Sequence, residues 1–197
     1  MALIFDLGRV IVSWDPVSIV SRVRGPQGAE ELARRLFDHP DWLDVDRGTL
    51  SLHTMAQRAE ARTRLSAADN LAILNAVPPS LVPDPAMVAL LGELHARGER
   101  LIALSNMGHA SIDYLEQHGN FWHFFSGKVV SARVRMMKPE PDIYRYLLVA
   151  HDLQAGECTF IDDSPANVAA AERIGMRGIL FESEVQCRQA LKEAGLL

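Results

Sequence analysis

The second half of the chain alternates between short apolar runs and amphipathic segments, and this alternation constrains the fold more than any other feature. Apolar runs of about four to eight residues are typical of buried strands, whereas apolar residues spaced three and four apart indicate helices. Strand and helix in repeated alternation predict a parallel sheet with helices on both faces. The predicted strands are 100–105, 128–131, 157–162 and 178–182, and the predicted helices are 85–98, 109–119, 141–153, 165–175 and 184–195.

A long helical stretch separates this half from one more predicted strand at the N-terminus. The apolar run LIFDLGRVIV (3–12) opens the chain, and only helical patterns follow it, from Trp14 to about Val82. The proline-rich segment PPSLVPDP (78–85) predicts a linker after those helices. The first strand must therefore pair with strands that come after the helical stretch. We expect an α/β fold with a Rossmann-like, three-layer α/β/α parallel-sheet core, formed by 1–13 and 84–197, and an inserted helical cap at 14–83.

Asp6 places a carboxylate inside the first predicted strand, after only three apolar residues. Burying an unpaired carboxylate costs several kcal/mol, so this position needs a partner, a metal ion or access to solvent. The plainer interpretation is that Asp6 caps the end of a short strand. The other strand ends decide between the two.

Further polar residues follow other predicted strands of the sheet. Ser105 and Asn106 end one strand, and Asp162 and Asp163 end another, while Lys138 lies in the loop MMKPEPD before a helix. In an open parallel sheet, ligands bind outside the carboxyl ends of the strands. We therefore expect these side chains to converge with Asp6 at one edge of the sheet.

Converging carboxylates, a lysine and a Ser-Asn pair have a coherent chemical meaning. Three carboxylates without a cation would repel one another and raise a pKa strongly, whereas Mg²⁺ is held by carboxylates, waters and a substrate phosphate. A lysine and a Ser-Asn pair beside that cation suit the oxygens of a phosphoryl group. One carboxylate could then attack phosphorus and form an aspartyl-phosphate intermediate.

Four sequence motifs resemble those of the haloacid dehalogenase superfamily, in the same order. They are FDLGRVIV (5–12), LSN (104–106), MKPEPDIY (137–144) and FIDDSPANV (160–168). The resemblance covers the whole predicted core, and the helical stretch stands where that superfamily carries its helical cap. The DLG, KPxxxIY and DDSxxN patterns look most like small bacterial sugar-phosphate phosphatases, including the glucose-1-phosphate phosphatase type.

The resemblance implies a role for each motif residue. Asp6 would be the nucleophile and a metal ligand, and the backbone carbonyl of Gly8 a second ligand. Asp162 and Asp163 would hold Mg²⁺ directly or through water. Ser105, Asn106 and Lys138 would bind the phosphoryl group, Lys138 also facing Asp6, with Asn167 as a supporting contact of Lys138. The implied function is Mg²⁺-dependent hydrolysis of a small phosphorylated metabolite, with a sugar phosphate as the expected substrate.

One position departs from the pattern of many phosphatases in this superfamily. They carry a second Asp two residues after the nucleophile as general acid and base, and here that position is Gly8. Proton transfer by a positioned side chain contributes about 10²–10⁴-fold to a rate. Either Asp15 or a cap residue supplies the acid, or the substrate has a good leaving group such as an anomeric phosphate, or turnover is slow.

Two other functions use the same residues and stay open. A 2-haloacid dehalogenase also has an Asp nucleophile and lacks the second Asp, but it attacks carbon without a metal and has no need of Asp162 and Asp163 together. A non-catalytic phospho-acceptor or binding module would use the Asp, metal and Lys without turnover. The residues by which the cap could select a substrate are Trp14, Asp15, Trp42 and Arg47, although packing is the simpler explanation for the tryptophans and a surface turn for Arg47.

Composition narrows the partners of the chain. Its 197 residues carry 20 Lys and Arg against 25 Asp and Glu, a net charge of −5, so nothing resembles the basic stripe of a nucleic-acid-binding protein. Two cysteines build no disulfide framework, and no apolar run approaches the roughly 18 residues of a membrane helix. The start of the chain does not read as a signal peptide. We expect a cytoplasmic monomer or homodimer that contacts neither nucleic acid nor membrane.

Overall fold

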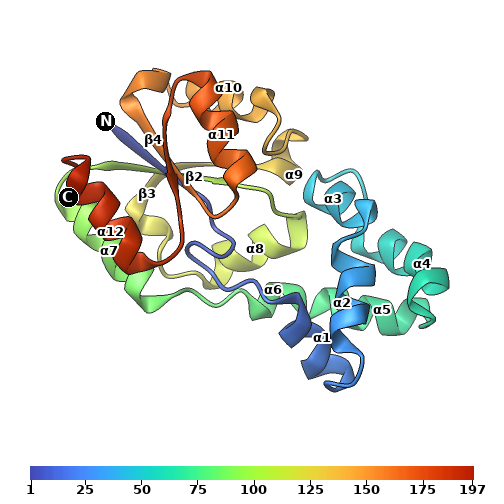
Figure 1. Ribbon diagram of the computed structural model, residues 1–197. Helices are drawn as coiled ribbons and strands as arrows, with labels where there is room; N and C mark the ends of the chain where they lie inside the picture. The colour runs from blue at the N-terminus through green and yellow to red at the C-terminus, as the bar shows by residue number, and fades with distance from the viewer.

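The computed structural model describes all 197 residues and has a five-stranded parallel sheet at its centre (Figure 1). The strand order is β3-β2-β1-β4-β5, so the N-terminal strand is the middle one. Ala2 of β1 pairs with Arg100 of β2 on one side and with Cys158 of β4 on the other. The strands are β1 (Ala2–Phe5), β2 (Arg100–Ser105), β3 (Phe125–Val130), β4 (Cys158–Asp162) and β5 (Arg177–Leu180).

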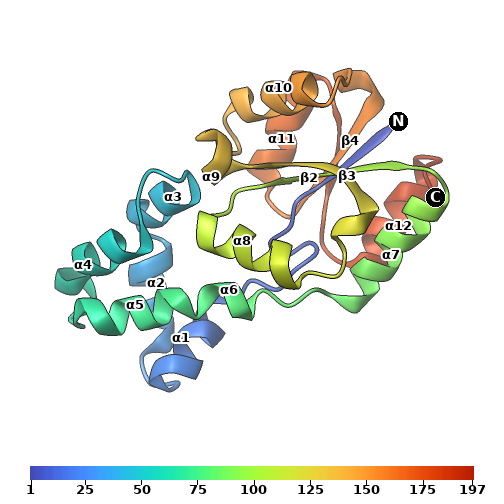
Figure 2. The ribbon, with the colours of Figure 1, turned by 180° about the vertical axis from the view of Figure 1, so that it is seen from behind.

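Helices cover both faces of the sheet, and the alternation of side chains along β1 shows why. Leu3 and Phe5 point into a cluster with α7 (Pro85–Ala96), α8 (His109–His118) and α12 (Glu184–Glu193). Ala2 and Ile4 point into a second cluster with α10 (Pro141–Ala150) and α11 (Pro165–Ile174). The predicted three-layer α/β/α architecture is therefore confirmed (Figures 1 and 2).

Six helices between β1 and α7 form a separate body beside the sheet. They share a hydrophobic cluster of their own, which includes Ile19, Leu36, Met55 and Ile73. Figure 2 shows this body to one side of the core, with α6 leading back toward α7. The helices are α1 (Pro16–Arg24), α2 (Ala29–Phe37), α3 (Pro40–Asp46), α4 (Leu52–Thr63), α5 (Ala67–Asn75) and α6 (Val77–Ser80).

The chain enters and leaves the helical body through two adjacent segments. Ser13 N–H donates to the carbonyl of Val82 (2.9 Å), and Asp84 N–H donates to the carbonyl of Ile11 (2.8 Å). The predicted linker at 78–85 is partly wrong, because its first residues belong to α6. Prolines are tolerated in the first turn of a helix, where the missing N–H has no partner, and Pro78 occupies such a position. The division into a core (1–13, 84–197) and a cap (14–83) stays a prediction.

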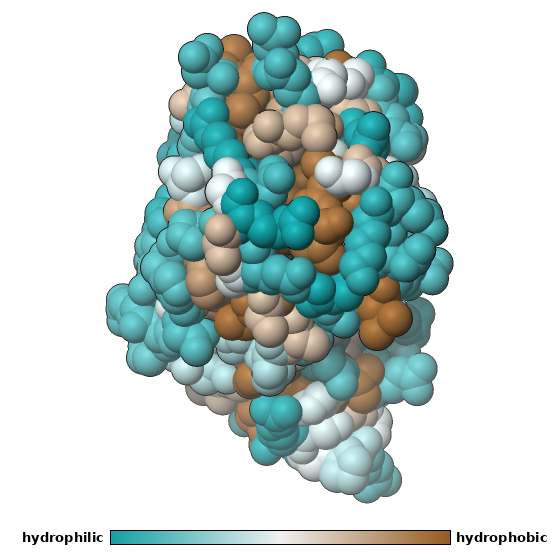
Figure 3. Space-filling view, turned by 90° about the vertical axis from the view of Figure 1, so that its left-hand side faces the viewer, coloured by the Kyte–Doolittle hydropathy of each residue, from teal (hydrophilic) through white to brown (hydrophobic).

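The face of the core farthest from the helical body is mostly hydrophilic (Figure 3). Apolar patches on this face are small and are interrupted by polar side chains. None of the helices is both long and apolar enough to cross a lipid bilayer.

Candidate active site

Three neighbouring strands end in the polar residues that the sequence singled out. Ser105 is the last residue of β2, Asp6 follows directly after β1, and Asp162 is the last residue of β4. Because these strands are adjacent and parallel, all three side chains arrive at the same edge of the sheet. The convergence expected from the sequence is observed.

Lys138 joins them from the loop before α10 and lies between two carboxylates. Its Nζ is 2.9 Å from Asp6 Oδ1 and 2.6 Å from Asp162 Oδ2, and its side chain is only 1% exposed. Burial alone would lower the pKa of Lys138, but the two carboxylates outweigh it and raise that pKa above its usual value. The lysine is therefore a permanent positive charge at the centre of the site.

The side chain of Asn106 fixes the backbone of Lys138. It accepts from the Lys138 N–H (2.8 Å) and donates to the Lys138 carbonyl (2.8 Å). These two bonds use one donor and the oxygen of its amide, so the side chain holds the lysine in place. The backbone N–H of Asn106 has no acceptor in the protein and lies at the cavity that contains Asp6.

Asp162 is fully buried, and both of its oxygens already accept hydrogen bonds. Oδ1 accepts from Ser164 N–H (2.8 Å) and Asn167 Nδ2 (2.9 Å), and Oδ2 accepts from Lys138 Nζ (2.6 Å). Asn167 therefore supports Lys138 through Asp162 rather than by contacting it. Its own carbonyl accepts from the Tyr144 hydroxyl (2.9 Å), which ties α11 to α10.

The carboxylate of Asp6 has one committed oxygen and one free oxygen. Oδ1 accepts from the Leu7 N–H (2.6 Å) and from Lys138 Nζ (2.9 Å). No protein group donates to Oδ2. Burial raises the pKa of Asp6 to about 6, against the opposing effect of Lys138. An oxygen without a donor, on a carboxylate held in one orientation, is suited to nucleophilic attack.

Asp163 and Gly8 complete the acidic side of the site. Asp163 is 27% exposed at its side chain, and its nearest cation is Arg9 (3.7 Å). Burial and the charge of Asp162 raise the pKa of Asp163. The Gly8 carbonyl accepts no hydrogen bond, because the tight turn after Asp6 closes through the carbonyls of Leu7 and Val12 instead.

These carboxylates can hold a metal ion. Asp6, Asp162 and Asp163 each offer an oxygen within 4.8 Å of the others. All are hard oxygen donors, which Mg²⁺ prefers. Burial and the charge of Asp162 raise the pKa values of Asp6 and Asp163, and a bound cation would offset both effects. The residues present therefore fit a divalent cation.

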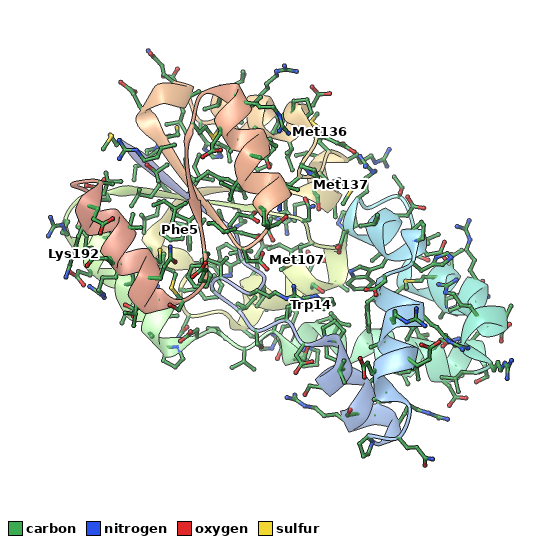
Figure 4. All side chains as sticks on the ribbon, in the orientation of Figure 1. Phe5, Trp14, Met107, Met136, Met137 and Lys192 are labelled. Carbon is green, nitrogen blue, oxygen red and sulfur yellow. The ribbon has the colours of Figure 1, made fainter.

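A cavity of about 250 Å³ lies above these groups, between the sheet edge and the helical body. Its polar side is formed by the residues described above, including Asp6, Ser105 and Asp163. The lining also has an apolar part, and Figure 4 shows Trp14 and Met107, which belong to it, where the core faces the helical body. The apolar lining consists of Trp14, Trp42, Val77, Leu81 and Met107.

The two tryptophans form one wall. Trp14 and Trp42 stack with ring centroids 5.6 Å apart, and Phe37 packs edge-on against both. A second, mostly apolar cavity of about 300 Å³ adjoins this wall and shares Trp42, Val77 and Ser111 with the first.

The cap candidates from the sequence separate into two groups. Trp14 and Trp42 line the cavity, as expected of residues that select a substrate. Arg47 instead pairs with Glu140 (2.9 Å), and Asp15 caps α1 by accepting from Ser18 N–H (3.0 Å). Both polar candidates therefore serve the structure and lie outside the cavity lining.

Asp46 lines the cavity and was missed by sequence reasoning. It is the last residue of α3 and accepts from Gly108 N–H through Oδ1 (3.0 Å). The segment PDWLDVDRGTLS contains three acidic residues, and no spacing rule separates the one that faces the core. The contact joins the helical body to the loop after β2.

The polar groups at this sheet edge form a hydrolase-type site on a Rossmann-like core. They are an Asp after β1, a Ser at the end of β2, a buried Lys and two consecutive Asp at the end of β4. The chain belongs to the haloacid dehalogenase-like hydrolases, whose family pattern matches residues 8–175. The family predicted from the motifs is thus confirmed.

Known relatives agree with this assignment. The chain is 27% identical over 195 residues to the sesquiterpene phosphatase astK of Aspergillus oryzae, covering 98% of this chain and 96% of that protein. It has the fold of a haloacid dehalogenase family enzyme of Bacteroides thetaiotaomicron, solved with magnesium and inorganic phosphate (TM-score 0.71, 22% identity, 92% and 93% coverage). An L-2-haloacid dehalogenase of Xanthobacter autotrophicus shares it too (TM-score 0.68, 18% identity, 100% and 84% coverage).

Proposed function

We propose that this hydrolase is a Mg²⁺-dependent phosphatase that cleaves small phosphate monoesters through an aspartyl-phosphate on Asp6. The observation that carries the proposal is the carboxylate of Asp6, which keeps Oδ2 free beside both Lys138 and an acidic cluster. The similarity to a phosphatase over nearly the whole chain supports it as well.

The metal would be held by Asp6, the Gly8 carbonyl and Asp163, with Asp162 acting behind them. Both oxygens of Asp162 already accept hydrogen bonds. Asp163 instead faces the cavity, and its only close cation is Arg9, 3.7 Å away. When bound, the cation would neutralise negative charge on the phosphoryl oxygens and the carboxylates.

The chain's own residues account for the remaining chemistry. Asp6 Oδ2 attacks phosphorus while Oδ1 stays bound to Lys138 and Leu7, so the carboxylate does not rotate. Ser105 and Asn106 line the cavity, so the Ser105 hydroxyl and the Asn106 N–H would bind the phosphoryl oxygens. The ammonium of Lys138, beside Asp6, would stabilise their charge. Water then attacks the aspartyl-phosphate and releases phosphate.

The acidic cluster favours this function over the two alternatives. A dehalogenase attacks carbon without a metal and has no use for a metal-binding set of carboxylates, although it shares this fold. A phospho-acceptor needs no cavity for a leaving group, and here one of about 250 Å³ adjoins Asp6.

The leaving alcohol has two candidates. The motifs predict a sugar phosphate, and this stays a prediction. The tryptophan wall and the adjoining apolar cavity favour an apolar alcohol instead, because such walls offer few partners for sugar hydroxyls. A prenyl-type monophosphate matches this lining, and the relative from Aspergillus oryzae is a sesquiterpene phosphatase.

The test is phosphate release from glucose 1-phosphate and from farnesyl monophosphate, in EDTA and in Mg²⁺. We expect Mg²⁺-dependent release, faster with farnesyl monophosphate, and none with Asp6→Asn. Trp42→Ala should raise the KM for farnesyl monophosphate, whereas Trp122→Ala, a tryptophan outside the cavity lining, is the matched control.

Other results would replace the proposal. Chloride release from 2-chloropropionate without metal would establish the dehalogenase. A phosphorylated Asp6 that persists with no phosphate release would establish the phospho-acceptor. Faster release from glucose 1-phosphate would restore the sugar phosphate as substrate.

A further inference from the structure

The phosphatase chemistry proposed above needs a proton donor that Gly8, two residues after Asp6, does not supply; the inference below rests on that proposed function. An alcohol that leaves phosphorus as an alkoxide needs a proton, and Gly8 has no side chain to give one. A Cβ added at Gly8 would meet no atom within 4 Å, so the space that an acid would occupy there is open.

Only one other carboxyl group lines the cavity outside the candidate metal ligands. The acidic lining residues are Asp6, Asp163 and Asp46. Asp46 comes from the helical-body side of the cavity, where the end of α3 meets the loop after β2. That is the side from which a leaving alcohol would be contacted, because the phosphoryl group is held by the core.

Asp46 is fixed in place, with one oxygen committed and one free. Oδ1 accepts from Gly108 N–H (3.0 Å), and the Asp46 carbonyl accepts from the Ser131 hydroxyl (2.5 Å). No protein group donates to Oδ2. A side chain held by one oxygen leaves the other to carry a proton to a bound group.

We propose that Asp46 is the general acid and base of this enzyme and takes the role that Gly8 cannot fill. As Asp6 Oδ2 bonds to phosphorus, the bond from phosphorus to the alkyl oxygen breaks, and that oxygen takes the proton of Asp46. A water molecule then loses a proton to the Asp46 carboxylate and attacks phosphorus. The bond from phosphorus to Asp6 breaks, and inorganic phosphate leaves.

The surroundings of Asp46 favour the protonated form that the first step requires. Burial raises the pKa of Asp46 to about 8, the Gly108 N–H lowers it in part, and the negative charge of Asp6 raises it further. At neutral pH the carboxyl group therefore keeps its proton until the alcohol leaves.

The neighbouring polar groups do not fill this role as well. Asp15 caps α1 and does not line the cavity. Ser111 lines it, but a serine hydroxyl is too weak an acid to protonate an alkoxide at neutral pH. Asp6 is the proposed nucleophile and a metal ligand, and Asp163 is a proposed metal ligand.

The test compares Asp46→Asn with Asp44→Asn, a matched change on the same helix outside the cavity lining. Asparagine keeps an oxygen to accept from Gly108 N–H, so the melting temperature should hold. With an alkyl phosphate, Asp46→Asn should lose about 10²–10⁴-fold in kcat. With p-nitrophenyl phosphate, whose leaving group needs no proton, it should release one nitrophenolate per enzyme in a burst and then stall, because the base is missing.

Gly8→Asp placed in the Asp46→Asn variant should restore turnover of the alkyl phosphate, because the added side chain has room. An Asp46→Asn enzyme that turns over the alkyl phosphate as fast as Asp44→Asn would overturn the inference while leaving the phosphatase intact. An inactive wild type would instead remove the proposed function. Should Asp46→Asn not fold, a wild-type rate that falls steeply with the pKa of a phenol leaving group would show that no general acid acts.

Discussion

Replacing Asp6, the proposed nucleophile, should make the metal-free protein more stable. Asp6 is 8% exposed, and its pKa is raised from 3.8 to about 6, chiefly by burial, with Lys138 opposing the shift. One pKa unit corresponds to about 1.4 kcal/mol, so ionised Asp6 costs the folded state about 3 kcal/mol at neutral pH. Asparagine removes the charge and keeps an oxygen to accept from Leu7 and Lys138. Asp6→Asn should therefore raise the free energy of unfolding by about 3 kcal/mol in EDTA.

The pH dependence of this gain has a definite sign. A carboxyl group with a raised folded pKa contributes no penalty below its unfolded pKa, because it is protonated in both states. The penalty grows as the pH rises from about 4 to about 6 and is constant above that. Urea unfolding of wild type and Asp6→Asn in EDTA should give equal free energies near pH 4 and the full difference near pH 7.5.

Adding Mg²⁺ should reduce the difference, because at the proposed metal site wild type would bind the ion more tightly than a variant that lacks one ligand. A ligand at 100 times its Kd stabilises the folded state by about 2.7 kcal/mol. The reasoning is wrong if Asp6→Asn is no more stable than wild type in EDTA, or if the difference is the same at both pH values. Asp84→Asn, an exposed helix-capping residue, controls for the loss of a carboxylate as such.

Three further predictions concern Lys138, the two aspartates at the end of β4 and one glycine. Lys138→Ala leaves two buried carboxylates without their cation, so urea unfolding should show a loss of about 3–5 kcal/mol. Asp163→Asn should raise the Mg²⁺ concentration for half-maximal activity at least about tenfold. Asp162→Asn should instead lower kcat more than it lowers the affinity for Mg²⁺. A calorimetric Mg²⁺ titration of each variant measures that affinity apart from kcat. Gly48→Ala should lower the melting temperature more than Gly28→Ala, because both have φ above +70° but only the first would place a Cβ 2.4 Å from the Ala132 carbonyl oxygen of α9 (Ser131–Val134). Equal losses would mean that the contact yields without cost.

The strands were predictable because a buried parallel strand needs apolar side chains on both faces. The run RLIALS matches β2 residue for residue, since its neighbours cover it on both sides. The bounds of β3 were less accurate, with 128–131 predicted and Phe125–Val130 observed. This edge strand is half exposed over its first four residues, so Phe125, Ser126 and Gly127 do not form an apolar run.

The positions of Asp6, Ser105 and Asp162 were predictable because each follows from where a strand ends. The place of Lys138 was harder to fix, because a loop residue has no periodicity; its contact with Asp6 was given by the resemblance. The partner of Asn106 was beyond the sequence, since its amide could equally have faced the substrate. The catalytic and metal-binding roles of these residues stay predictions.

The cap side of the cavity could not be read from the sequence. Asp46, Arg47 and Asp15 all looked like polar residues near turns. Which one faces the core depends on how α3 docks beside the loop after β2, and that docking is set by contacts such as the one from Gly108 to Asp46. Contacts between residues so distant in the sequence leave no local pattern.

The central place of β1 has a consequence for how the protein is made. Its partner β2 lies nearly a hundred residues later, and its other partner, β4, comes later still. At a synthesis rate of about 5–20 residues per second, the first strand waits roughly 5–20 s before any strand can pair with it. The six helices are complete before then and have their own hydrophobic cluster. The helical body beside the candidate active site can therefore fold first, and Asp6 reaches its place in the sheet only when the second half of the chain arrives.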